Sequence, residues 1–130
     1  MQFELSILTA AEYEFVDAAL ASWEGVACHS PFPVRALGFS DRDQFWSEIE
    51  RLRQLASVGA VVTDLEAARV LFLSELAFGS DLFGAGIEFR YVSPFSDEEA
   101  LAALRALQRK LYTHSGAKAL FRPELYPDPE

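Results

Sequence analysis

Alternation of apolar and polar residues predicts strands in two segments of the chain. Residues 2–8 and 87–92 each repeat with a period of two, which is typical of a strand with one buried and one solvated face. The short β-branched segment 60–62 predicts either a third strand or an extended link. Any sheet built from these segments is therefore small.

A period of three to four residues predicts four helices, over residues 10–23, 41–56, 64–78 and 97–114. The third of these is apolar nearly all round, so we expect it at the centre of the domain. Three of the helices follow a Ser or Thr that lies three residues before a Glu, which is the sequence of a capping box. These predicted caps are Thr9, Thr63 and Ser96.

Glycine residues punctuate this pattern. Gly79 stands where the third helix needs a C-terminal cap, and Gly116 is expected to end the last helix. Gly84 and Gly86 are expected to supply positive backbone torsions in a turn. A phosphate-binding loop is not expected there. Such a loop ends in Gly-Lys-Ser or Gly-Lys-Thr ahead of a helix, and no Lys or Arg lies between Arg69 and Arg90.

The pattern as a whole indicates an α+β fold: one helix-rich domain of about four helices with a small two- or three-stranded sheet. The alternative is a mostly helical fold in which only residues 87–92 and 2–8 pair, as a two-stranded ribbon. Residues 1–121 are expected to form this single globular domain, and the Pro-rich residues 122–130 to form an extended C-terminal tail.

Composition supports a folded domain. Hydrophobic residues make up 51% of the 130 residues and aromatic residues 13%, which excludes global disorder. The single cysteine, Cys28, rules out an intrachain disulfide. The first residues lack the basic and apolar regions of a signal peptide, and the longest apolar stretch, residues 67–78, is too short to cross a bilayer. We therefore expect a soluble, cytoplasmic protein that does not engage a membrane.

The charge is unusual in size and in distribution. The chain has 20 acidic and 11 basic residues, for a net charge of −9. Residues 1–34 contain no Lys or Arg, whereas residues 100–123 contain no carboxylate. Such a field attracts cationic partners and repels nucleic acid, so we expect a basic protein as partner and no nucleic acid. The same charge can also serve solubility alone.

Residues able to perform catalysis or to hold a metal ion are few. Cys28 and His29 are neighbours, and adjacent side chains in an extended segment point to opposite sides, so His29 is badly placed to activate the thiol. Zinc needs four closely spaced ligands, more than the chain's three Cys and His residues can provide. The acidic run 97–99 is explained by the start of a helix, where the dipole favours negative charge. No catalytic residue, metal site or cofactor is predicted.

The segment 24–40 has no sustained period, and Pro31 and Pro33 disfavour regular structure within it. Long loops of this kind are often functional. If the segment lies on the surface, Phe32 and Phe39 are exposed beside an acidic helix and form a binding patch. If its side chains fold back, they fill the core instead. The sequence leaves both readings open.

The leading hypothesis is a protein-binding module, of the inhibitor or immunity type, that occludes a basic partner. Carboxylates of the first helix would steer the partner, and the loop phenylalanines would anchor it. One alternative is a homo-oligomeric structural or regulatory protein that uses the same patch on itself. Another is a small enzyme or ligand-binding domain built on carboxylates such as Glu75, Asp81 and Glu88. The expected binding residues are Glu12, Glu14, Asp17, Glu24, Phe32 and Phe39.

Overall fold

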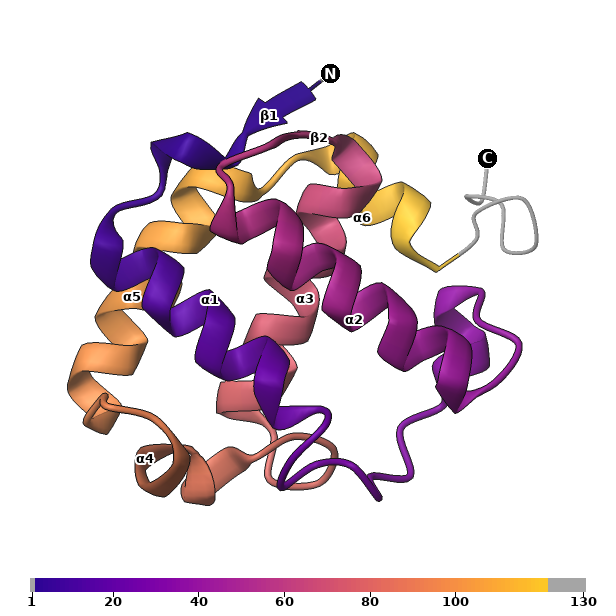
Figure 1. Ribbon diagram of the computed structural model, residues 1–130, viewed down its shortest axis with the longest axis vertical. Helices are drawn as coiled ribbons and strands as arrows, with labels where there is room; N and C mark the ends of the chain where they lie inside the picture. The colour runs from indigo at the N-terminus through magenta and orange to yellow at the C-terminus, as the bar shows by residue number, and fades with distance from the viewer. Residues whose placement is uncertain (1, 122–130) are drawn as a thin grey trace.

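The computed structural model describes residues 2–121, which form six α-helices, three short 3₁₀ helices and one two-stranded sheet (Figure 1). The sheet lies at one end of the longest axis and α4 near the other, with the longer helices between them. The α-helices are α1 (Ala10–Ser22), α2 (Arg42–Ser57), α3 (Asp64–Gly79), α4 (Phe89–Val92), α5 (Asp97–Leu111) and α6 (His114–Leu120); the 3₁₀ helices are η1 (Leu5–Ile7), η2 (Val34–Leu37) and η3 (Gly86–Glu88); the strands are β1 (Gln2–Glu4) and β2 (Val61–Thr63).

Helix α3 is the centre of the core, as its apolar sequence predicts. It packs against α1, α5 and α6, and its buried side chains include Ala67, Val70 and Leu73. Trp23, which ends α1, is almost completely buried, and its Nε1 donates a hydrogen bond to the Leu73 carbonyl oxygen over 3.1 Å. The polar atom of the indole is thereby satisfied inside the core.

Capping boxes begin α1, α3 and α5 at the residues that the sequence predicts. At α1, the Thr9 hydroxyl accepts a hydrogen bond from the Glu12 amide over 3.2 Å, and the Glu12 carboxylate accepts one from the Thr9 amide over 3.0 Å. The predicted helix over residues 97–114 is in fact two helices, because α5 ends at Leu111 and α6 begins at His114. The fold is therefore helix-rich as expected, with more helices than the four predicted.

The sheet joins the N-terminal segment to the link between α2 and α3. Strands β1 and β2 pair antiparallel, with Phe3 opposite Val62. The predicted strand 2–8 ends at Glu4, because the chain then turns into η1 and buries Leu5. The segment 60–62 thus contributes a strand rather than a simple link, and the described part of the chain holds a small antiparallel sheet of two strands.

The predicted strand 87–92 is wrong, and with it the ribbon that would pair this segment with residues 2–8. The segment is helical, from η3 into α4. Phe89 is completely buried, with its ring 5.6 Å from that of Phe15 and 5.5 Å from that of Phe78. Ile87 and Tyr91, which alternate with it, face solvent instead. One buried anchor between two exposed apolar residues imitates a strand pattern in so short a segment.

Gly79 and Gly116 act differently from the prediction. Gly79 is the last residue of α3, without a positive φ, and Ser80 caps the helix. Gly116 lies inside α6, where an added Cβ would stand 2.9 Å from the Asp64 carbonyl oxygen and 3.2 Å from the Cβ of Ala68. Glycine is therefore needed at Gly116 for the close approach of α6 to α3, and it does not end a helix. The predicted tail, residues 122–130, lies outside the described residues.

Candidate protein-binding surface

The loop phenylalanines expected to anchor a partner are inside the protein. Phe32 exposes 7% of its surface and Phe39 exposes 6%. The Phe32 ring packs 5.8 Å from Trp23 and 5.8 Å from Phe83, and the Phe39 ring packs 5.6 Å from Phe45. The alternative reading, in which the side chains of residues 24–40 fold back into the core, holds for the apolar residues from Phe32 to Phe39, whereas Val26 stays exposed.

Arg69 of α3 holds part of this loop in place. Its guanidinium lies 4.7 Å from the centre of the Phe39 ring and donates hydrogen bonds to the Leu37 carbonyl oxygen over 3.2 Å and to Glu48 over 2.8 Å. A cation against an aromatic face is stabilised when both are shielded from water. No local pattern predicts this contact, because it joins residues thirty positions apart in the chain.

The four carboxylates expected to steer a partner have different surroundings. Glu12 is buried in the α1 capping box and forms an ion pair with Lys110, 2.5 Å away. Burial by itself would raise the pKa of Glu12, but the hydrogen bonds from Lys110 and Thr9 outweigh it and lower that pKa. Asp17 pairs with Arg53 of α2 over 3.0 Å. The two remaining carboxylates, at positions 14 and 24, are exposed and form no ion pair among the described residues.

A network of ion pairs neutralises most of the cations on α2 and α3. Arg51 contacts Glu48 over 2.7 Å and Glu66 over 2.5 Å, and both bonds raise the pKa of its guanidinium, chiefly through Glu48. Arg69 shares the Glu48 carboxylate. Because these cations are paired within the chain, the excess negative charge falls on carboxylates elsewhere on the surface.

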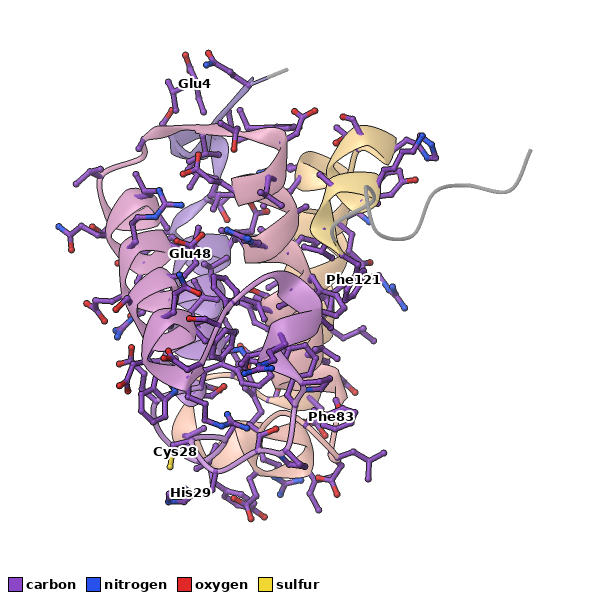
Figure 2. All side chains as sticks on the ribbon, turned by 90° about the vertical axis from the view of Figure 1, so that its right-hand side faces the viewer. Glu4, Cys28, His29, Glu48, Phe83 and Phe121 are labelled. Atoms are coloured by element: carbon purple, nitrogen blue, oxygen red, sulfur yellow. The ribbon has the colours of Figure 1, made fainter. Side chains whose placement is uncertain are left out.

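Exposed apolar side chains gather at the end of the molecule that carries α4. Leu82, Ile87 and Tyr91 expose 81%, 72% and 75% of their surfaces, and Val26, Val92 and Leu101 are also exposed. More than half of the large apolar residues exposed in the described part of the chain lie here. Figure 2 shows Cys28, His29 and Phe83 at this same end, opposite Glu4. We call the following set the α4 surface: Val26, Asp81, Leu82, Ile87, Glu88, Arg90, Tyr91, Val92, Asp97, Glu98 and Leu101.

Three open hollows adjoin one another across the α4 surface. One of about 400 Å³ lies between Val26 and Ile87. A second, of about 360 Å³, continues from Ile87 to Leu101. The third, of about 630 Å³, meets the second at Glu98 and reaches Tyr91. Because neighbouring hollows share lining residues, the three form one continuous surface. Apolar side chains line each of them.

The turn that follows α3 positions this surface. Gly84 lies so close to α3 that an added Cβ would stand 2.0 Å from the Leu76 carbonyl oxygen. Gly86 has a φ of 54°, which confirms the positive torsion expected there, whereas the positive torsion expected at Gly84 is wrong. The Asp81 carboxylate accepts a hydrogen bond from the Ile87 amide over 3.2 Å and fixes the start of η3. These contacts present Leu82 and Ile87 outward on a rigid turn.

Carboxylates surround the apolar side chains of the α4 surface. They are Asp81 and Glu88 on the turn and η3, and Asp97 and Glu98 in the first turn of α5. Among the residues that line the three hollows, Arg90 alone is an Arg or Lys, and its guanidinium lies 5.0 Å from the ring of Tyr91. Apolar residues within a charged rim are typical of protein interfaces, and this rim is negative.

The residues considered for catalysis do not come together. Within residues 2–121 no hydrogen bond joins the Cys28 thiol to a histidine or a carboxylate. Asp81 and Glu88 line the same hollow, whereas Glu75 accepts a hydrogen bond from Gln108 over 2.7 Å at a separate place between α3 and α5. Over the same residues, no group of three or more His, Cys, Asp or Glu side chains is placed to hold a metal ion.

The part of the chain that the structure describes contains no helix of the length and apolar character needed to cross a membrane. Comparison of the chain with protein-family models, with curated proteins and with solved structures finds no match in any of the three. The geometry of the α4 surface is therefore the basis on which a function can be proposed.

Proposed function

We propose that the protein is a binding module that docks on a basic protein through the α4 surface and blocks the partner's own site, as an inhibitor or immunity-type protein does. One observation supports this most strongly: five exposed apolar residues line the three adjoining hollows, and four carboxylates line the same hollows. A cluster of apolar side chains exposed to water is costly in free energy and is typical of an interaction site.

The two kinds of residue have different parts in this proposal. Leu82, Ile87 and Tyr91 lose water when the partner docks, which supplies most of the affinity. The carboxylates of the rim attract Lys and Arg side chains at a distance, which raises the rate of association and selects a cationic partner. The anchors thus differ from those that the sequence predicts, while the class of partner is the same.

Affinity capture from the native cell with matched variants tests the proposal. The test variant carries Leu82→Ser, Ile87→Ser and Tyr91→Ser. The control carries Ser at three residues that are also exposed and apolar but lie on η1, after α2 and on β2. These control changes are Ile7→Ser, Val58→Ser and Val61→Ser.

We expect the wild-type chain and the control to capture a basic protein that the test variant does not capture. Both variants should fold, since all six side chains are exposed and each substitution should change the unfolding free energy by no more than about 0.5 kcal/mol. Capture that survives in the test variant and is lost in the control would place the interface at the other end of the molecule and reject the proposal.

A further inference from the structure

The solvent-facing side of α5 carries opposite charges at its two ends. Asp97 and Glu98 lie in its first turn, and Arg105 and Arg109 lie nearer its end. Among the described residues, none of the four forms an ion pair within the chain. Arg105 donates a hydrogen bond to the neutral amide of Gln108 over 2.7 Å, and the Glu75 carboxylate, which Gln108 contacts, lines the same hollow without forming an ion pair with Arg105.

Between these charges the exposed side of α5 is apolar and partly small. Leu101 exposes 45% of its surface, and Ala102 beside it is also exposed. Alanine at such a position lets another helix approach closely, and helix axes pack 8 to 10 Å apart, depending on the side chains at the contact. The point midway in sequence between Glu98 and Arg105 falls between Leu101 and Ala102, so these two charges are arranged symmetrically about an apolar centre.

We propose that a second copy of this chain binds here, with the two α5 helices antiparallel about a two-fold axis at Leu101 and Ala102. A two-fold interface pairs each residue twice, so Glu98 of each copy faces Arg105 of the other. Arg109, one turn farther along, lies outside this pair, because the same axis places it opposite Pro94 of the other copy. The charged pair and the apolar contact are therefore each used twice.

Charge complementarity favours a second copy over any other occupant of this helix face. The molecule carries −9 overall, which opposes self-association through most of its surface. The four α5 charges sum to zero, so this face escapes that repulsion. A basic partner would meet Arg105 and Arg109 as like charges, and an acidic partner would meet Asp97 and Glu98.

Self-association is independent of the proposed function. One consequence does rest on that function: the dimer would cover Glu98 and Leu101, which also belong to the α4 surface, so a second copy and the basic partner would compete. The monomer would then be the form that binds the partner.

Sedimentation equilibrium of the full chain at micromolar concentration, with charge-swap variants, tests the dimer. Wild type should reach twice the mass of the chain. Glu98→Arg and Arg105→Glu should each weaken dimerisation by about tenfold or more, because each creates two like-charge pairs. The double variant should recover most of the affinity, since the swapped pair is again complementary.

A matched control separates this pairing from general repulsion. Glu14→Arg makes the chain less negative by the same amount as Glu98→Arg, at an exposed position on α1. Reduced repulsion alone would strengthen association in both variants, whereas we expect only Glu98→Arg to weaken it.

A cysteine cross-link provides a second measurement. In a Cys28→Ser background, Ala102→Cys should form an intermolecular disulfide under mild oxidation, because the two positions meet near the axis. Gln54→Cys, exposed on α2, should not. A wild-type chain that stays monomeric, single variants that dimerise as well as wild type, or a double variant no better than the singles would each overturn the inference. None of these results would affect capture of a basic protein by Leu82, Ile87 and Tyr91.

Discussion

At the scale of the residue, type and sequence position alone do not decide whether a side chain anchors a partner or the core. Phe32 and Phe39 lie in a long segment with two prolines, yet both are buried because the segment folds over α3. Ile87 and Tyr91 lie in a segment that reads as a strand, yet both face water. In each case a contact distant in sequence sets the environment, and the local pattern does not record it.

Phe39→Ala should therefore act on stability. The change removes the ring that packs on Phe45 and under the Arg69 guanidinium, and leaves a cavity. We expect a loss of about 3 to 5 kcal/mol in the free energy of unfolding, measured by urea denaturation. A variant as stable as wild type that no longer captures the partner would show that Phe39 belongs to the interface after all.

Glu12 gives a prediction about pH. Its pKa is lowered in the folded chain, so its carboxylate contributes stability above its unfolded pKa, and this contribution is lost as pH falls through the folded value. Glu12→Gln keeps an acceptor for the cap but removes the charge that Lys110 contacts. The variant should be less stable by roughly 1 to 2 kcal/mol at pH 7, with the difference shrinking below about pH 4.

Urea denaturation of both proteins across the acid range measures this difference. The same deficit at pH 3 and at pH 7 would mean that Gln disturbs the packing and that the charge of Glu12 contributes nothing.

At the scale of the element, the sequence predicts what local physics determines. The starts of α1, α3 and α5 depend on capping boxes within four residues, and all three are found as predicted. The central place of α3 follows from its apolar sequence. The α4 segment, the break after Leu111 and the role of Gly116 depend instead on contacts with α3 and α1, which a period in the sequence cannot reveal. We missed the α4 surface in the sequence for that reason. Apolar residues beside a glycine-rich turn were a usable signal in the sequence.

Gly84, in the turn after α3, and Gly79, the last residue of α3, make a matched pair of test and control positions. Gly84→Ala places a Cβ 2.0 Å from the Leu76 carbonyl oxygen, which is backbone and cannot move aside without shifting the turn. We expect a loss of about 1 to 3 kcal/mol, seen as a lower Tm by circular dichroism.

Gly79→Ala is the control, because an added Cβ there meets no atom within 4 Å. Since alanine favours helix, this change should be neutral or stabilising by up to about 1 kcal/mol. Equal effects of the two substitutions would contradict the tight contact between the turn and α3.

At the scale of the whole molecule, the distribution of charge explains more than its total. Four cations form ion pairs with carboxylates of the same chain: Arg51, Arg53, Arg69 and Lys110. Among residues 2–121, the carboxylates on the rim of the α4 surface form no ion pair. A net charge of −9 would be compatible with solubility alone, but its placement around exposed apolar side chains favours docking.

The rate of association with the captured partner should fall steeply with salt. Attraction between the rim carboxylates and a cationic surface acts at a distance and is screened over about 8 Å at physiological ionic strength. Stopped-flow mixing at increasing salt measures it. A rate of association that does not change with salt would show that the rim has no part in steering.

Hydrogen–deuterium exchange of the full chain, with and without its captured partner, tests the central claim most directly. If the α4 surface is the interface, binding will slow exchange of backbone amides in residues 79–101 and in the short stretch around Val26, and will leave α2 unchanged. Protection confined to the exposed faces of α1 and α2, with residues 79–101 exchanging as in the free protein, would contradict it.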